Sequence, residues 1–229
     1  MTAVNIDIVS DVMCPWCYVG KKRLEAALKE LPQNIEVDVR WRPYQLDATL
    51  PKEGKDRKEY LSEKFGGSER AKQIYDAILD AGREENIPFD FEAIAVSPNT
   101  LDAHRIIRWA ASEAPGVQDR LVDILFRAYF LEGKNIGDNT ILLEAAEKAG
   151  MDRAITEGLL SGTADCLEVE QEIEVARKMG VTGVPCFIID NKYAVMGAQT
   201  ADVLSNAIAE VARQKETELA SEEQVAEET

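Results

Sequence analysis

Two cysteines separated by two residues are the feature of this sequence most able to do chemistry. They form Cys14-Pro15-Trp16-Cys17, directly after an apolar segment and at the start of an expected helix. The two intervening residues let Cys17 curl back to within bonding distance of Cys14. Unpaired amide groups and the positive end of a helix dipole stabilise a thiolate, the nucleophilic form of cysteine. The pattern predicts redox chemistry, with Cys14 as the exposed, readily ionised nucleophile and Cys17 as the resolving thiol.

The same spacing also occurs in zinc sites, which need four ligands. The other candidate ligands are Cys166, Cys186 and the single histidine, His104. They form neither a second Cys-x-x-Cys nor a pair at metal-ligand spacing. The sequence therefore favours a redox pair over a zinc site or an inert structural pair, and no metal is expected.

A second segment, Gly183-Val184-Pro185, stands directly before the apolar run Cys186–Ile189. Proline cannot donate a hydrogen bond within a sheet, so Pro185 belongs at the start of a strand. A cis bond there would expose the Val184 backbone for pairing with an extended substrate. The alternative is a trans proline that only opens the strand, which is the commoner state of such bonds.

Composition limits the partners and the compartment. The 229 residues carry 42 acids and 26 bases, a net charge of −16, which argues against nucleic-acid or anionic-membrane partners. The first residues lack a leader pattern, and no stretch approaches the roughly 18 apolar residues of a membrane span. We expect a cytoplasmic protein, in which four cysteines are too few for a disulfide scaffold.

Periodicity predicts the elements that must position these motifs. A strand over 4–9, a helix to 31 and a strand over 35–41 form a crossover unit of parallel strands. Helical spacing then dominates over 74–81, 101–110, 121–131, 138–150 and 151–160. A helix to Gly180, a hairpin of 186–189 with 193–196, and a helix over 201–211 follow. The expected organisation is 1–50 and 165–214 as one domain, 51–164 as an inserted helical domain, and 215–229 as an acidic disordered tail.

The motifs together resemble the DsbA family of thiol–disulfide oxidoreductases. The resemblance rests on the run from Val9 to Cys17, on Gly183-Val184-Pro185 and on the helical segment between them, over roughly residues 4–212. The segment from Pro98 to Arg105 and the Cys-Pro-Trp-Cys spelling are similar to the cytosolic FrnE-like branch.

The resemblance implies an α/β protein with a thioredoxin-like fold and an inserted all-helical domain. It also implies a redox-active Cys14–Cys17 disulfide, with Val184 and a cis Pro185 holding the substrate beside it. The implied partners are protein thiols or disulfides, or small thiols. Glutathione is a possible redox partner, no cofactor is tightly bound, and the chain is a monomer or a homodimer.

Other activities remain open within this resemblance. Kappa-class glutathione transferases and 2-hydroxychromene-2-carboxylate isomerases share the fold but typically carry serine at the position of Cys14, so a glutathione-dependent isomerase or transferase is the second hypothesis. A holdase chaperone that uses the helical segment is the third. Better-known periplasmic members have histidine where this chain has Trp16, and a neutral indole cannot stabilise the Cys14 thiolate. This difference predicts a less oxidising disulfide.

Four residues near the motif have less certain roles. Asp11 either accepts a proton or caps the turn, and capping is favoured. His104 is either an ordinary polar residue or a hydrogen-bonding group at the active-site face. Trp16 and Tyr18 flank the pair as a possible apolar contact surface, although Tyr18 equally fits packing within the helix.

The remaining cysteines have two interpretations. Cys166 lies on the apolar stripe of its helix, and Cys186 follows Pro185 in a buried strand. Free cysteine is among the most buried residue types, so two small core residues are favoured over a second disulfide or a relay thiol.

Overall fold

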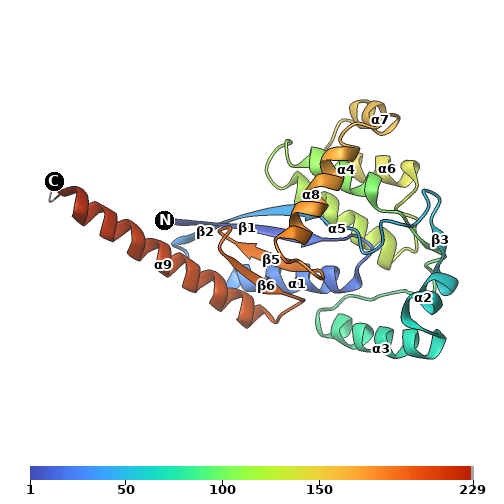
Figure 1. The fold of residues 1–229 in the computed structure, drawn as a ribbon, viewed down its shortest axis with the longest axis horizontal. Coiled ribbons are helices and arrows are strands. Elements are labelled where there is room, and N and C mark those ends of the chain that lie inside the picture. Colours follow the sequence, from blue (N-terminus) through green and yellow to red (C-terminus); the bar gives the residue numbers. More distant parts are fainter. Residues whose placement is uncertain (228–229) are drawn as a thin grey trace.

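The computed structural model describes residues 1–227 and shows an α/β protein (Figure 1). Its strands are β1 (Thr2–Ser10), β2 (Ile35–Pro43), β3 (Lys55–Asp56), β4 (Val96–Ser97), β5 (Cys186–Ile189) and β6 (Tyr193–Met196). Its helices are α1 (Pro15–Glu30), α2 (Arg57–Phe65), α3 (Ser68–Glu84), α4 (Leu101–Ala110), α5 (Val117–Phe130), α6 (Asn139–Ala149), α7 (Arg153–Leu160), α8 (Cys166–Lys178) and α9 (Ala201–Glu227).

The main sheet has the strand order β2-β1-β5-β6. β1 runs parallel to β2, and α1 forms the predicted crossover between them, whereas β5 is antiparallel to both β1 and β6. The β5–β6 hairpin turns through Asp190, Asn191 and Lys192, and the positive φ angles of 49° at Asp190 and 55° at Asn191 suit a tight turn. The sheet therefore joins the first and the last parts of the chain.

Helices cover both faces of this sheet. α9 packs against α1 and β1, whereas α4, α5 and α8 pack against β2, as Figure 1 shows. The alternating residues Val4, Ile6 and Ile8 of β1 are buried in a hydrophobic core that also includes residues of α4, α5 and α6. The buried Lys21 of α1 pairs with Asp119 of α5 at 3.1 Å and so ties α1 to the helical part.

The segment between β2 and α8 is mainly helical, as predicted, and contains three elements that periodicity missed, α2, β3 and β4. Asp138 caps the start of α6 by accepting a hydrogen bond from the Thr140 amide, and Gly150 caps its end with φ 106°, as the sequence indicated. α2 was missed because its residues are mostly polar, although Asp56 caps it. The short β3–β4 pair was missed because two-residue strands carry no periodicity.

The end of the chain differs from the prediction. The last helix was predicted to end at residue 211 and residues 215–229 to be disordered, but α9 continues to Glu227. Acids in this part have partners on β1 and in the turn between β5 and β6, since Glu216 accepts a hydrogen bond from Thr2 and Glu218 pairs with Lys192 at 3.1 Å. The prediction for residues 228 and 229 lies outside the described residues. The boundaries at 50 and 165 stay a prediction, because the sheet and the helices share one core.

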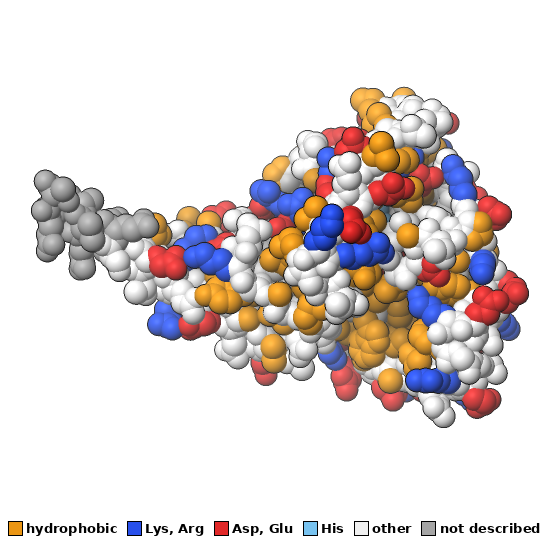
Figure 2. All heavy atoms as spheres, viewed as in Figure 1, with side chains coloured by type: hydrophobic (Ala, Val, Ile, Leu, Met, Phe, Trp, Pro, Cys, Tyr) orange, Lys and Arg blue, Asp and Glu red, His pale blue; other side chains and the backbone are white. Residues whose placement is uncertain are grey.

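Charged side chains of both signs are interspersed over the face seen in Figure 2. Apolar side chains gather on the same face between the part that carries β5 and β6 and the helices α2 and α3. Within residues 1–227, no helix is both long and apolar enough to span a bilayer.

Candidate active site

The Cys-x-x-Cys segment forms a tight turn at the carboxyl end of β1. Cys14 is the N-cap of α1 and Pro15 occupies its first position, where a missing amide hydrogen costs nothing. The Cys14 amide donates to the Asp11 carbonyl at 2.9 Å, and the Cys17 amide donates to the Cys14 carbonyl at 3.0 Å. Both cysteines therefore lie on the first turn of one helix, as the sequence predicted.

Asp11 is fully buried and braces this turn. Its Oδ1 accepts from the Met13 amide at 3.3 Å, and its Oδ2 accepts from the Leu46 amide at 2.7 Å. These contacts match the capping interpretation and also fix the loop that follows β2. The Nε2 atom of His104 lies 3.4 Å from Oδ1 of Asp11, and His104 is only 2% exposed. The structure thus brings His104 from α4 to the back of the redox turn.

Both cysteines of the turn are buried. Cys14 is 4% exposed and Cys17 is 1% exposed, so the prediction of an exposed Cys14 is wrong. Its sulfur is covered by chain from the far end of the sequence, since Sγ of Cys14 donates to the Val184 carbonyl at 3.7 Å. The position of Cys14 at the start of a helix does not by itself show that a distant segment buries its sulfur.

The burial of Cys17 has an electrostatic consequence. Burial raises the pKa of the Cys17 thiol well above its ordinary value, and the adjacent Cys14 adds to this. The Ser10 hydroxyl and the Asp11 backbone oppose the increase. Cys17 is therefore held as a neutral thiol near neutral pH, which fits a group that reacts second.

The Val184–Pro185 bond is cis, as the resemblance implied, and it faces α1. The Pro185 carbonyl accepts from the Gly197 amide at 2.8 Å, which fixes the loop to the end of β6. A Cβ atom on Gly20 would lie 2.9 Å from Cγ of Pro185. Because a real Cβ atom essentially never comes so close, only glycine permits this approach of α1 to the proline loop.

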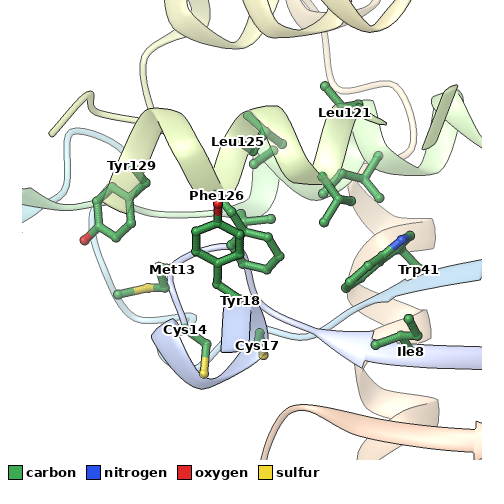
Figure 3. Close-up of a cluster of buried hydrophobic side chains, with 14 of the residues drawn as sticks. Ile8, Met13, Cys14, Cys17, Tyr18, Trp41, Leu121, Leu125, Phe126 and Tyr129 are labelled. Carbon is green, nitrogen blue, oxygen red and sulfur yellow. The ribbon is translucent and has the colours of Figure 1, made fainter. Parts of the chain in front are cut away.

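Aromatic residues beside the pair have two different environments. Tyr18 is 2% exposed and stacks on Phe126 of α5, with ring centroids 5.0 Å apart, so it packs within the core (Figure 3). Trp16 is half-buried at the core edge. Of the two predicted contact residues, the structure leaves Trp16 partly available to a partner.

The second pair of cysteines is not joined. All four cysteines, which lie within the described residues, are free thiols. Cys186 is fully buried in a small cluster with Val9, Tyr44 and Val181, as expected for a core residue. Cys166 is half-buried at the first position of α8, so it is not a core residue.

The sequence did not reveal a cluster of one arginine and two tyrosines at the start of α2. Arg57 is buried and Tyr129 accepts a hydrogen bond from it at 3.1 Å. Tyr75, from α3, lies beside the same guanidinium. The three residues lie 18 to 72 positions apart and share no motif, so nothing in the sequence connects them.

Comparison with known proteins assigns this architecture to a family. The model of the DSBA-like thioredoxin domain matches residues 5–209. The crystal structure of probable DsbA oxidoreductase SCO1869 from Streptomyces coelicolor is 31% identical, with a TM-score of 0.81 over 90% of this chain and 89% of that chain.

Two other solved structures show the fold alone, because their sequence identities are low. A 2-hydroxychromene-2-carboxylate isomerase is 17% identical, with a TM-score of 0.69 over 93% of this chain and 98% of that chain. The cytosolic disulfide reductase DsbM from Pseudomonas aeruginosa with GSH is 18% identical, with a TM-score of 0.60 over 94% and 99%. The FrnE-like branch stays a prediction.

Proposed function

The chain belongs to the family of DSBA-like thioredoxin domains, and from this premise we propose that it is a thiol–disulfide oxidoreductase acting through Cys14 and Cys17. One observation carries the proposal. Two cysteines share the first turn of α1, and Sγ of Cys14 contacts the Val184 carbonyl next to a cis Pro185. A substrate strand paired with Val184 would bring its sulfur to Cys14.

The proposed cycle moves two electrons and keeps sulfur and protons in balance. The Cys14 thiolate attacks one sulfur of a substrate disulfide, forms a mixed disulfide and releases the other sulfur as a thiolate. Cys17 then loses its proton to that thiolate or to solvent and attacks Sγ of Cys14. The Cys14–Cys17 disulfide forms and the second substrate thiol leaves, so the substrate is reduced and the protein is oxidised. The reverse sequence oxidises a substrate dithiol.

The turn around Cys14 supports a moderate rather than a strongly oxidising potential. The first turn of α1 holds no charged group and Trp16 is neutral, so this turn supplies no positive charge that would make the disulfide strongly oxidising. We expect a potential below that of the strongly oxidising members, about −120 mV. Titration of the pair against glutathione measures this potential. A value near about −120 mV would contradict the expectation that the neutral Trp16 makes the disulfide less oxidising.

We further propose protein thiols or small thiols as partners and glutathione as the reductant in a cytoplasmic setting. The DsbM structure, described as a cytosolic disulfide reductase with GSH, supports this choice by its fold. The likeness to the isomerase is also one of fold. Such isomerases typically carry serine at the position where this chain has Cys14, so the isomerase activity is the second candidate.

Replacement of each candidate nucleophile tests the proposal. Cys14→Ser should abolish insulin reduction by the reduced protein, whereas Cys166→Ser should leave it unchanged. Both positions begin a helix, so the second variant controls for the loss of a thiol at such a position. Full activity of folded Cys14→Ser would refute the proposed function.

A further inference from the structure

The buried arginine Arg57 is enclosed by aromatic rings. Arg57 is 4% exposed, and Cζ of its guanidinium lies 5.0 Å from the ring centroid of Tyr75, 5.6 Å from Phe91 and 5.9 Å from Tyr129. These rings come from α3, the loop before β4, and α5. Aromatic faces stabilise a cation in part, but they do not use its directional N–H donors.

The guanidinium has few polar partners. Nη1 donates to the Tyr129 hydroxyl at 3.1 Å, whereas Nη2 is buried with no hydrogen-bond partner among residues 1–227. No Asp or Glu in that part of the chain forms an ion pair with Arg57. A buried charge without a counter-charge costs several kcal/mol. The side chains of this region leave one donor and one positive charge unmatched.

A second buried arginine shows how this chain satisfies such a group elsewhere. Arg105 is 1% exposed and pairs with Asp102 at 2.7 Å. It also donates to the carbonyls of Leu159, Gly162 and Ala164 at 2.6 to 2.9 Å. Its donors are engaged and its charge is matched, as expected for a structural clamp. Arg57 has no such counter-charge, and its buried Nη2 group has no acceptor among the described residues. A purely structural role does not explain this unpaired donor.

The Arg57 cage lies next to the redox turn. Burial raises the pKa of Tyr75, the charge of Arg57 and its hydrogen-bonding contact with the Tyr75 hydroxyl oppose this increase, and the nearby Cys14 adds to it. In Figure 3, Tyr129 lies on the same side of the turn as Met13 and Cys14. Apolar side chains also gather between the β5–β6 part and the helices α2 and α3 (Figure 2). The cage around Arg57 and the redox turn therefore border the same part of the molecule.

We infer that Arg57 binds a carboxylate carried by the substrate of Cys14, so that the preferred small substrates are thiols and disulfides with a free carboxylate. Guanidinium donors match carboxylate oxygens in geometry and charge. The surrounding rings exclude water, which strengthens the pairing. The inference rests on the proposed function and names the substrate class for the same site.

Glutathione and its dimethyl ester provide the test, because the ester blocks both carboxylates at nearly unchanged length. The measurement is the rate, per thiolate, at which each reduces the Cys14–Cys17 disulfide of the full chain. The net charge of −16 alone would slow the anionic thiol. We expect glutathione to react about tenfold faster, as suits one hydrogen bond to a charged group.

Variants assign this preference to Arg57. Arg57→Met should remove it, so that glutathione loses its advantage over the ester, and Arg57→Lys should retain part of it. Lys64→Met removes the same charge from the far end of α2 and should retain the full preference. A preference that survives in Arg57→Met, or that disappears in Lys64→Met, would contradict the inference.

The wild-type comparison decides the question even where Arg57→Met fails to fold. Equal rates for the two thiols, or a faster ester, would overturn the carboxylate site and leave the proposed function standing. Failure of both thiols to reduce the disulfide would overturn the inference and glutathione as the proposed reductant, whereas failure of the reduced protein to reduce insulin would overturn the proposed function itself.

Discussion

The cysteine pairs Cys14–Cys17 and Cys166–Cys186 occupy similar positions in the fold, but only the first pair lies on a single helical turn. In each pair one cysteine begins a helix, Cys14 at α1 and Cys166 at α8, and the other is fully enclosed, Cys17 at 1% and Cys186 at 0% exposure. Cys14 and Cys17 share one helical turn. Cys166 and Cys186 belong to a helix and a strand, and both are free thiols.

The surroundings of the two helix starts differ as well. The Val184 carbonyl approaches Sγ of Cys14, and α1 has no acid in its first turn. Next to Cys166, the carbonyls of Gly162 and Ala164 are held by Arg105, and α8 carries Glu168 in its first turn. The two helix starts therefore differ in the feature that the proposed redox step needs, a second thiol one turn away, which α1 provides and α8 does not.

The largest expected effect separates the two enclosed cysteines. Cys17→Ser should abolish turnover in insulin reduction and leave partners trapped on Cys14, because no thiol remains to resolve the mixed disulfide. Cys186→Ala should retain turnover, since Cys186 lies in the cluster around Val9 and Tyr44. Non-reducing electrophoresis with peptide mapping measures both. Partners trapped on Cys186, or turnover in Cys17→Ser, would erase the distinction between the pairs.

The second effect concerns the structure around Cys166. Arg105→Met should lower the free energy of unfolding by about 3–5 kcal/mol, because it leaves Asp102 and several backbone carbonyls without their buried partner. The half-exposed Arg108, which pairs with Asp165 at 3.4 Å and also with Glu172, is the matched control, and Arg108→Met should cost less than about 1 kcal/mol. Urea unfolding measures both changes. Equal losses would show that Arg105 is no more important than a surface charge.

The third effect is the pH dependence of the reduced protein. The pKa of Cys17 is raised by burial, so the folded state keeps a proton that the unfolded state releases above its own pKa of about 8.5. The resulting stability is fully present below about pH 8.5 and is lost as the pH rises through the folded pKa. We expect a decrease of about 1.4 kcal/mol per pH unit in that window.

Urea unfolding between about pH 8.5 and 9.5 measures this slope, and its difference from Cys17→Ser isolates the contribution of one thiol. Burial also raises the pKa of Cys186, so Cys186→Ala should remove a similar but smaller part of the slope. Identical slopes in wild type and Cys17→Ser would show that the burial of Cys17 does not control its ionisation.

The sequence predicted the pairs better than it predicted what covers them. The strand–turn–helix position of Cys14 and Cys17 follows from local periodicity, and the cis Pro185 followed from the resemblance. The burial of Cys14 depends on the Val184 carbonyl, 170 residues away, and no local pattern reports such a contact. The environment of Arg57 could not be predicted for the same reason, because the aromatic rings around it come from three separate parts of the chain. The local sequence pattern thus indicates which residues are candidates for the reaction, whereas tertiary packing determines how far each of them is buried.

The smallest expected effect tests that packing at the contact between α1 and the proline loop. Gly20→Ala gains about 1 kcal/mol of helix propensity but places a Cβ atom 2.9 Å from Cγ of Pro185 and 3.2 Å from Cζ of Phe187. The strain of such overpacking is about 1–3 kcal/mol, so the net change in the free energy of unfolding should be a loss of up to about 2 kcal/mol. Gly158→Ala in α7, where a Cβ atom would meet nothing within 4 Å, should instead be neutral or stabilising. Because the displaced loop carries the Val184 carbonyl, Gly20→Ala should also slow reduction of insulin severalfold, whereas Gly158→Ala should not. A Gly20→Ala protein with unchanged stability and rate would mean that the proline loop shifts freely, and the contact between Cys14 and Val184 would then have no part in positioning the substrate.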